Sequence, residues 1–410
     1  MMIMTAAAPC QPFSKMQTFR PETPEEIYRA IRERIQPHLR VLAQCRSEKE
    51  LGAHPVYRSL ETVIQTVLET PEIADYRARP APAKSRYRFL AWNIERGAEI
   101  EGQIRAFREH PYLSRCDVLL LTETDIGMAR SGNHHVAQTL ARELDLAYVF
   151  VPTYLNLTKG SGAEFDLPGD NEIGLHGDAI LSRYPVRNPR GIPMSNGMDK
   201  IAGREQRIGR PTAVAADIDF PGYPITAVAV HLDAQSSQRH RHGQMRDVLD
   251  RLDTPLPVVL GGDWNTSTYN STSALPAIAG FWLRVFMGVD HVIRNHYLDP
   301  GRLFERELFD LLESRGFDFR DCNVPGEYTV GYDVENARTR KSLGDWVPGW
   351  CFAFIRWALR NHGGKCPLKL DWFATRGVRV ESPAVIHDVR EGLARPLSDH
   401  DAIGIDVVAP

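Results

Sequence analysis

The sequence predicts an α/β protein with a mixed sheet. From Tyr87 onward, apolar strand-like runs alternate with amphipathic helical runs, which is the pattern of an α/β fold. Helical segments join some of the strands, whereas Phe220-Pro-Gly-Tyr predicts a hairpin, so parallel and antiparallel pairs are both expected. The 410 residues are 43% hydrophobic and 25% charged, which excludes wholesale disorder and suffices for a large core with an appendage.

Charge balance and cysteine spacing narrow the class of protein. With 49 basic and 52 acidic side chains, the net charge of −3 argues against a protein that coats nucleic acid by bulk charge. None of the six cysteines forms a CxxC pair or a zinc-ligand spacing, which is typical of reduced thiols. The first residues lack the features of a signal peptide, and no apolar run reaches the ~20 residues of a membrane span. We therefore expect a cytoplasmic protein without a transmembrane segment.

Residues 1–85 predict a helical N-terminal extension followed by a linker. Thr23-Pro24 is typical of a helix start, and the isoleucines that follow recur at helical period. A second helix is expected over residues 60–68. The prolines within residues 77–84 cannot continue a helix and predict the linker.

Residues 86–410 predict the main domain. Strands are expected at residues 87–92, 118–122, 148–152, 179–182, 212–218, 225–231, 257–260, 370–374, 378–380 and 403–408. Helices are expected at residues 101–109, 134–144 and 238–252. A stretch at about 270–365 has little strand pattern and predicts a helical insertion. Its aromatic residues indicate the core of a small helical subdomain or, alternatively, a surface for an apolar substrate or a lipid.

Acids, amides and imidazoles follow the predicted strands where each strand ends, as expected around an active site. They are Asn93, Glu95, Glu123, His231, Asp263, Asn265, Asp371, Asp399 and His400. Taken singly, each is more often a cap or turn residue, but the whole set predicts a site. Carboxylates crowded into one cleft repel one another unless a cation neutralises them. Oxygen ligands without cysteine favour Mg²⁺ first and Mn²⁺ second.

The order of these motifs resembles that of the endonuclease/exonuclease/phosphatase superfamily, which includes pancreatic-type deoxyribonuclease. The motifs are Trp92-Asn-Ile, Leu121-Thr-Glu, Gly177-Asp-Ala-Ile-Leu-Ser-Arg-Tyr-Pro, Val230-His-Leu-Asp, Gly262-Asp-Trp-Asn, Leu370-Asp-Trp-Phe and Ser398-Asp-His. The resemblance covers residues 87–408 and implies a four-layer α/β sandwich with two packed mixed sheets. It also implies metal-dependent hydrolysis of a phosphoester.

The resemblance assigns roles to the metal-binding positions. Glu123 is similar to the principal metal ligand, and it also fits that role best on its own chemistry. Glu95 and Asp399 resemble secondary ligands that bind directly or through water. Asn93 resembles a donor to the phosphate or to the metal-binding carboxylate.

The remaining positions resemble the family's catalytic residues. Asp263 with Asn265 is similar to the pair that aligns the attacking water. His400, oriented by Asp371, resembles the histidine–aspartate dyad at the scissile phosphate. His231 resembles the second active-site histidine of the deoxyribonuclease and sphingomyelinase branches.

The substrate is less well defined by the sequence. His176, Asp178 and Arg210 are expected to bind phosphate or substrate, although many relatives carry asparagine where Asp178 stands. A phosphodiester is the favoured target, and a nuclease acting on DNA or RNA is the alternative, although no basic stripe that would follow a nucleic-acid backbone is present. A lipid phosphodiesterase acting through the aromatic insertion is a further option. A catalytically inactive relative that binds through the same cleft is the second alternative.

Overall fold

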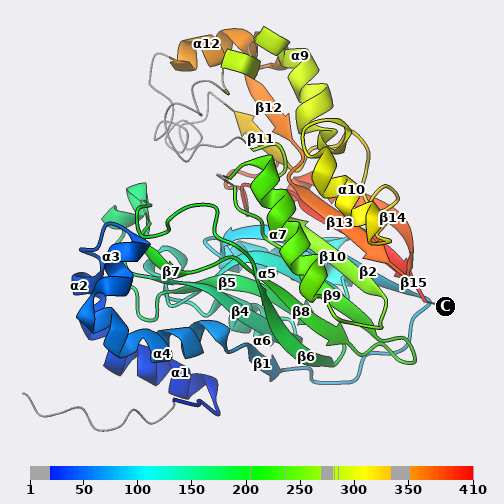
Figure 1. Ribbon diagram of the computed structural model, residues 1–410. Helices are drawn as coiled ribbons and strands as arrows, with labels where there is room; N and C mark the ends of the chain where they lie inside the picture. Colours follow the sequence, from blue (N-terminus) through cyan, green and yellow to red (C-terminus); the bar gives the residue numbers. More distant parts are fainter. Residues whose placement is uncertain are drawn as a thin grey trace, which may run out of the picture.

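Two mixed sheets face each other at the centre of the molecule (Figure 1). The computed structural model describes residues 19–203, 205–234, 236–268, 280, 282–284, 286–333 and 351–409. In this part of the chain the larger sheet has eight strands, ordered β1-β4-β5-β3-β2-β15-β14, with β7 paired to β4. The smaller sheet has five, ordered β13-β10-β9-β8-β6.

The strands of the larger sheet are β1 (Glu72–Asp75), β2 (Arg86–Arg96), β3 (Val118–Ile126), β4 (Ala147–Asn156), β5 (Leu175–Ser182), β7 (Arg207–Gly209), β14 (Arg379–Ile386) and β15 (Ala402–Val408). Those of the smaller sheet are β6 (Val186–Pro193), β8 (Thr212–Ile218), β9 (Ile225–Ala229), β10 (Val258–Asp263) and β13 (Asp371–Arg376). The pairs β2–β3 and β9–β10 are parallel, and β8–β9 is the predicted antiparallel hairpin. The prediction of mixed sheets is therefore confirmed.

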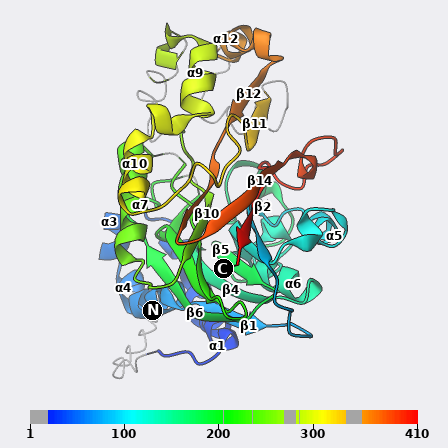
Figure 2. The ribbon, with the colours of Figure 1, turned by 90° about the vertical axis from the view of Figure 1, so that its right-hand side faces the viewer.

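Helices cover the outer face of each sheet and complete the predicted four layers. The helices α5 (Ile100–Glu109) and α6 (Val136–Glu143) lie on one side, and α7 (Gln238–Arg251) and α10 (Arg306–Ser314) on the other (Figure 2). One apolar cluster fills the space between the sheets and two others lie beneath the helices. The strand ends that carry the polar motifs are thus held by apolar clusters on both faces of each sheet.

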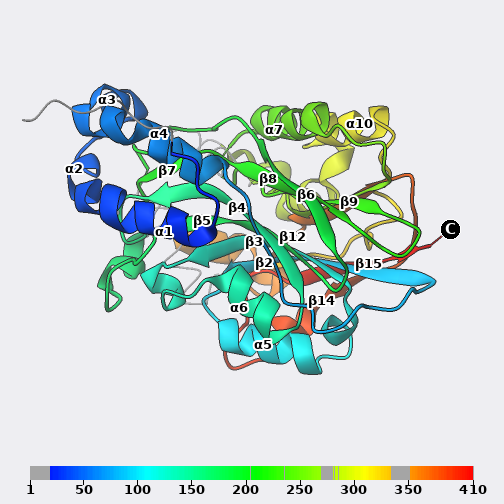
Figure 3. The same cartoon turned by 90° about the horizontal axis from the view of Figure 1, so that it is seen from below.

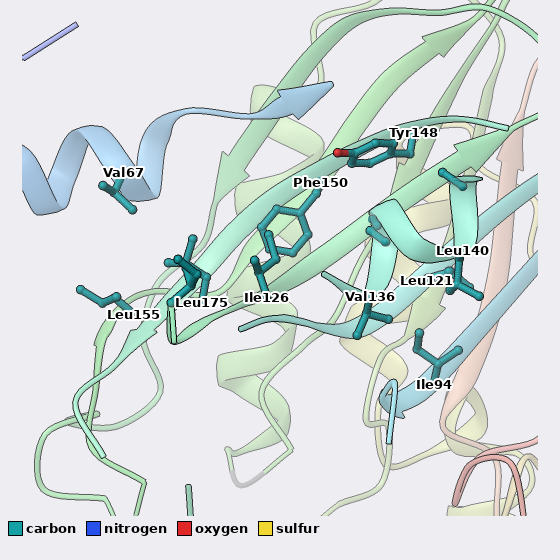
Figure 4. Close-up of a cluster of buried hydrophobic side chains, with 14 of the residues drawn as sticks. Val67, Ile94, Leu121, Ile126, Val136, Leu140, Tyr148, Phe150, Leu155 and Leu175 are labelled. Carbon is teal, nitrogen blue, oxygen red and sulfur yellow. The ribbon is translucent and has the colours of Figure 1, made fainter. Parts of the chain in front are cut away.

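The N-terminal helices pack against the larger sheet. They are α1 (Pro24–Ala30), α2 (Leu39–Leu42), α3 (Glu48–Ala53) and α4 (Pro55–Glu69), and α4 lies against β4 (Figure 3). Val67 of α4 belongs to the same buried cluster as Phe150 of β4 and Leu140 of α6 (Figure 4). Between α1 and α2 the chain passes through a π-turn at Ile31–Ile35 and a 3-10 turn at Gln36–His38. Pro37 lacks the N–H that a continuous α-helix needs there.

Several strands were not expected from the sequence. Strand β1 precedes the proline-rich stretch and pairs with β4, so the chain joins the sheet before the expected linker. Strand β6 contains two prolines and a glycine and has no apolar alternation, but it lies at the edge of its sheet, where prolines are tolerated. The domain boundary at residue 86 stays a prediction.

The helical insertion is present, and it also contains a strand pair. Its described elements include α9 (Val289–Val292), α10 and α12 (Cys351–Ala358), with β11 (Val330–Asp333) paired to β12 (Lys365–Leu368). A small apolar cluster of its own joins α9, α12, β11 and β12, whereas the buried apolar residues of α10 pack with those of α7 and the smaller sheet. Phe286 and Trp357 are 82% and 60% exposed, so these two aromatics do not belong to a core. No helix among the described residues is long and apolar enough to cross a membrane.

Some aromatic residues of the insertion lie outside the description. Phe281, Trp346 and Trp350 are not among the described residues, and the side chains of Phe352 and Phe354 are not described either. The interpretation of the aromatic stretch as a lipid-binding surface gains no support from the described part of the insertion.

Candidate active site

Strand ends from both sheets bring most of the predicted residues together at one edge of the sandwich. Strands β2 and β3 are parallel neighbours, so Asn93 and Glu123 lie at the same end of the larger sheet. In the smaller sheet Asp263 ends β10 and pairs in register with Asp371, the first residue of β13. His400 precedes β15, which lies beside β2. Residues far apart in the chain thus form one cluster.

The backbone is irregular where β2 and β3 carry the acidic residues Glu95 and Glu123. The pairing of β2 with β3 slips between Asn93 and Arg96, and Glu95 and Arg96 have left-handed φ angles of 46° and 66°. Glu123 has a φ of 55° where β3 slips against β5. This conformation costs a non-glycine residue ~1–2 kcal/mol, and such strain concentrates at functional sites.

Asn93 connects acids from the two sheets. Its Nδ2 donates to Glu123 Oε1 at 3.2 Å and to Asp263 Oδ2 at 3.1 Å. Its Oδ1 accepts the backbone N–H of Glu95 at 3.0 Å, which fixes the orientation of the amide. Two carboxylates that would repel each other are thereby held on one donor group.

His400 and Asp371 form a buried dyad. His400 Nδ1 lies 2.8 Å from Asp371 Oδ2, and the two side chains are 8% and 0% exposed. The other ring nitrogen of His400, Nε2, lies 3.7 Å from Asp263 Oδ2. Asp371 therefore orients the imidazole so that its second nitrogen faces Asp263.

Asp263 lies between two histidines. His231 Nε2 is 3.6 Å from Asp263 Oδ2, close to the distance of His400 from the same atom. The backbone N–H of Asn265 donates to Asp263 Oδ1 at 2.9 Å. The side chain of Asn265 donates to the carbonyl of Leu232 at 2.9 Å and so holds the turn after β10 beside the segment that carries His231.

The charges of this cluster favour protonated histidines. Burial lowers the pKa of His400, but the charges of Asp371 and Asp263 raise that pKa well above its ordinary value. Burial also lowers the pKa of His231, and Asp263, Asp178 and Glu123 outweigh it, so the pKa is raised. Burial raises the pKa of Asp263, although the neighbouring His400 opposes this shift. The result is an acid of raised pKa between two imidazoles whose pKa values are raised as well.

Glu123 and Asp178 have opposite shifts. Burial raises the pKa of Glu123, but the charges of Arg96, His231 and His176 outweigh it and keep that pKa well below its usual range. Burial raises the pKa of Asp178 to about 6, against the lowering effect of His231. Asp178 Oδ1 accepts the backbone N–H of Glu123 at 3.1 Å. Glu123 is therefore an ionised carboxylate at neutral pH.

Three predicted residues lie around this cluster rather than in it. His176 binds Asp125 Oδ1 at 2.7 Å through Nδ1 and stacks on Tyr154. Asp399 is exposed. Arg210 is exposed too, and among the described residues its side chain has no hydrogen bond or ion pair with the cluster.

Arg210 lines a cavity of about 730 Å³ between the N-terminal helices and the edge of the sandwich. Its backbone N–H donates to the carbonyl of Thr153 at 3.1 Å. Glu95 lies at the bulge of β2, beside Asn93. The roles predicted for Glu95, Asp399 and Arg210 stay predictions.

Sequence reasoning missed a buried ionic network next to the cluster. Arg130 is 3% exposed and binds Asp125 at 2.7 Å, Glu205 at 2.7 Å and Glu164 at 3.4 Å. Asp125 follows Glu123 by two residues, the spacing that puts both side chains on one face of a strand. The sequence could therefore have indicated Asp125 as a neighbour of the site. Arg130 and Glu164 lie in short 3-10 turns and Glu205 in a loop, and no local pattern indicated that these residues would pair with one another.

The donor atoms fit a hard cation. Glu123 is ionised, and the surrounding donors are carboxylate and amide oxygens with two imidazoles, which suits Mg²⁺ or Mn²⁺ better than a thiophilic metal. Among the described residues Asp263, Asp371 and His400 offer ligand atoms within 4.8 Å of one another. In that trio Nδ1 of His400 already binds Asp371, so we interpret the three residues as the His400–Asp371 dyad together with Asp263 rather than as a metal site. Glu123 stays the candidate principal metal ligand.

Fold and site together define a two-sheet α/β protein with an acid–imidazole cluster at the strand ends. The model of the Endonuclease/Exonuclease/phosphatase family matches residues 90–400, and the chain belongs to this family. The three activities in the family's name are all hydrolyses of phosphoric esters. Family membership therefore supports a phosphoesterase. No curated protein matches the chain.

Solved structures from three bacteria are similar in fold. The endonuclease/exonuclease/phosphatase from Beutenbergia cavernae is 17% identical, with a TM-score of 0.49 over 79% of this chain and 72% of that one. The protein of that type from Bacteroides vulgatus is 13% identical, with a TM-score of 0.45 over 80% and 100%. A 3'-5' exonuclease from Neisseria meningitidis is 14% identical, with a TM-score of 0.44 over 78% and 100%. These values are too low to bear on the substrate.

Proposed function

We propose that the protein is a metal-dependent phosphodiesterase. The observation that carries this proposal is the buried His400–Asp371 dyad facing Asp263, which Asn93 in turn connects to Glu123. Hydrolysis of a phosphodiester needs an aligned water, positive groups that offset the negative charge of the non-bridging oxygens, and a proton for the leaving oxygen. The cluster offers groups for each need.

Each group has a proposed part in the reaction. Asp263, whose pKa is raised, orients a water molecule and accepts its proton as the water oxygen attacks phosphorus. His400, held by Asp371, donates to a non-bridging phosphate oxygen as charge grows there. His231 gives its proton to the leaving oxygen as the phosphorus–oxygen bond breaks, which is consistent with its raised pKa.

Glu123, with Glu95 and Asp399 as further candidates, would hold Mg²⁺ or Mn²⁺. A bound divalent cation supplies positive charge that offsets the charge of the phosphate. Asn93 keeps the Glu123 carboxylate oriented by binding one of its oxygens at 3.2 Å.

The test is hydrolysis of bis(4-nitrophenyl) phosphate with and without Mg²⁺. We expect metal-dependent turnover that falls by ~10²–10⁴-fold in His400→Ala and in Glu123→Ala. Absence of turnover, or turnover that neither substitution affects, would exclude the proposal and favour an inactive binding relative. Plasmid DNA, RNA, sphingomyelin and phosphomonoesters under the same conditions then separate a nuclease from other phosphoesterases.

A further inference from the structure

Arg96 is placed beside the site by a strained stretch of backbone. Glu95, Arg96 and Gly97 have consecutive left-handed φ angles of 46°, 66° and 72°. A Cβ at Gly97 would lie 2.6 Å from the side chain of Val136, so the backbone of residues 95–97 packs tightly against the start of α6. Two non-glycine residues thus keep an unfavourable conformation at the bulge of β2, after which Arg96 pairs in register with Thr124 of β3.

The guanidinium of Arg96 lies between two carboxylates. Its Nε is 3.6 Å from Glu123 Oε2, and its Nη1 is 3.3 Å from Glu164 Oε1. Asn93 binds the other oxygen of Glu123. Neither contact of Arg96 is a close two-pronged pair, which is the strongest geometry for an arginine with a carboxylate.

Arg96 differs from the neighbouring Arg130 in its exposure and its bonds. Arg130 is 3% exposed, and two of its nitrogens bind both oxygens of Asp125, at 2.7 and 3.1 Å. The Arg96 side chain is 32% exposed and its two carboxylate contacts are longer. Arg130 therefore holds the structure together, whereas Arg96 keeps donor groups that are accessible from solvent next to Glu123.

We propose that Arg96 is a phosphate-binding residue, which exchanges its contacts with Glu123 and Glu164 for non-bridging oxygens of the substrate phosphate. The inference rests on the proposed function, because it places the phosphate at Glu123. A guanidinium matches two phosphate oxygens in geometry and keeps its charge at any physiological pH. In this arrangement Glu164 competes with phosphate for Arg96.

Two substitutions give opposite predictions. Arg96→Met removes the donors and is expected to weaken binding of inorganic phosphate by about 10–100-fold, and to raise KM for bis(4-nitrophenyl) phosphate, with Arg96→Lys intermediate. Glu164→Gln keeps the shape of the side chain but removes a competing charge, so it is expected to strengthen phosphate binding by several-fold. Arg86→Met is the matched control, because Arg86 begins the same strand, is 56% exposed and pairs with Glu381 at 2.8 Å.

Calorimetric titration with inorganic phosphate in excess Mg²⁺, together with steady-state kinetics, distinguishes the outcomes. Unchanged phosphate affinity and KM in both Arg96→Met and Glu164→Gln would overturn the inference even when the wild-type protein is active. A fall in kcat alone would also overturn it, since Arg96 would then act only by holding Glu123. Phosphate binding that depends on Arg96 in a protein without turnover would instead reject the proposed function and support the binding role. If Arg96→Met does not fold, the direction of the change in Glu164→Gln decides.

Discussion

His400 Nδ1 lies 2.8 Å from Asp371 Oδ2, and the carboxylate of this pair is completely buried. The second oxygen of Asp371, Oδ1, has no hydrogen-bond partner within the part of the chain that the structure describes. Because a charge is costly to bury, a carboxylate of this kind is not expected to stabilise the fold. We interpret its role as orienting His400 and raising the pKa of that imidazole.

Asp371→Asn is expected to change the pH dependence of the reaction as well as its rate. The charge of Asp371 is the main influence that raises the pKa of His400, so its removal lowers that pKa. Because the proposed role needs the protonated imidazole, the alkaline limb of the kcat/KM profile should move to lower pH, with kcat reduced by ~10²–10⁴-fold. Asp388→Asn is the matched control, since Asp388 pairs with His110 at 2.9 Å but is 68% exposed. An alkaline limb that stays in place would contradict the assignment.

Removal of metal should abolish turnover. We expect EDTA to stop hydrolysis and Mg²⁺ to restore it, because the cluster of acids needs a cation to bind an anionic substrate. Glu123→Gln should weaken Mg²⁺ binding, measured by calorimetry, by about tenfold or more. Glu143→Gln, an exposed partner of Arg108, should leave Mg²⁺ binding unchanged. Equal Mg²⁺ affinity in the two variants would count against Glu123 as a ligand.

Glu205 should make stability depend on pH. Burial raises its pKa, but Arg130 and Arg207 outweigh this and lower it from 4.5 to about 2. A carboxyl with a lowered pKa in the folded state stabilises above the unfolded value and loses that contribution as the pH falls from about 4.5 towards 2. Glu205→Gln should therefore cost about 3 kcal/mol at pH 7 and clearly less at pH 3, as measured by urea unfolding. The same difference at both pH values would contradict this account.

Gly262→Ala should damage both stability and activity. Gly262 has a φ of 137°, and a Cβ there would lie 2.3 Å from the carbonyl oxygen of Val230. The backbone must shift, and Asp263 is the next residue, so we expect a lower melting temperature together with a reduced kcat. At Gly243 in α7, an added Cβ would meet no atom of the described residues within 4 Å, so Gly243→Ala should instead stabilise the protein by up to ~1 kcal/mol. A Gly262→Ala variant with normal kcat would show that Asp263 tolerates displacement.

The insertion should depend on one buried ion pair. Arg241 of α7 binds Glu305 of the insertion, with Nε 3.0 Å from Oε1, and both side chains are 0% exposed. Arg241→Met leaves Glu305 buried without its partner and should destabilise the protein by about 3–5 kcal/mol in denaturant unfolding. The double variant Arg241→Met/Glu305→Leu should recover much of this loss. A double variant as unstable as the single one would mean that the pair itself, rather than an orphaned charge, provides the stability.

The sequence predicted the sheets well where the strands are buried on both faces. Strand β8 begins and ends at the expected residues, because six of its seven residues are buried and its centre is an unbroken run of alanine and valine. Strand β6 was missed because at a sheet edge the backbone pairs only on one side, and its prolines and polar residues are permitted. Pairing at an edge depends on the neighbouring strand rather than on the local sequence.

The central site residues were predictable because their chemistry follows strand ends. Asn93, Asp263 and His400 fall where strands of two sheets meet, and the resemblance supplied the order of the motifs. Two partners of Arg130 were not predictable, because Glu164 and Glu205 lie 34 and 75 residues away along the chain. Ion pairs over such distances depend on the finished fold.

The position of β15 has a consequence for the time at which hydrolysis can begin. Strand β15 pairs along β2, and the indole N–H of Trp92 donates to the carbonyl of His400, which is 308 residues later in the chain. While the chain is being synthesised, Asn93 and Glu123 are complete long before the dyad histidine leaves the ribosome. Under the proposed function, a nascent chain would therefore expose the candidate metal-binding acids without the dyad histidine, and hydrolysis would have to wait until the last strand has been added.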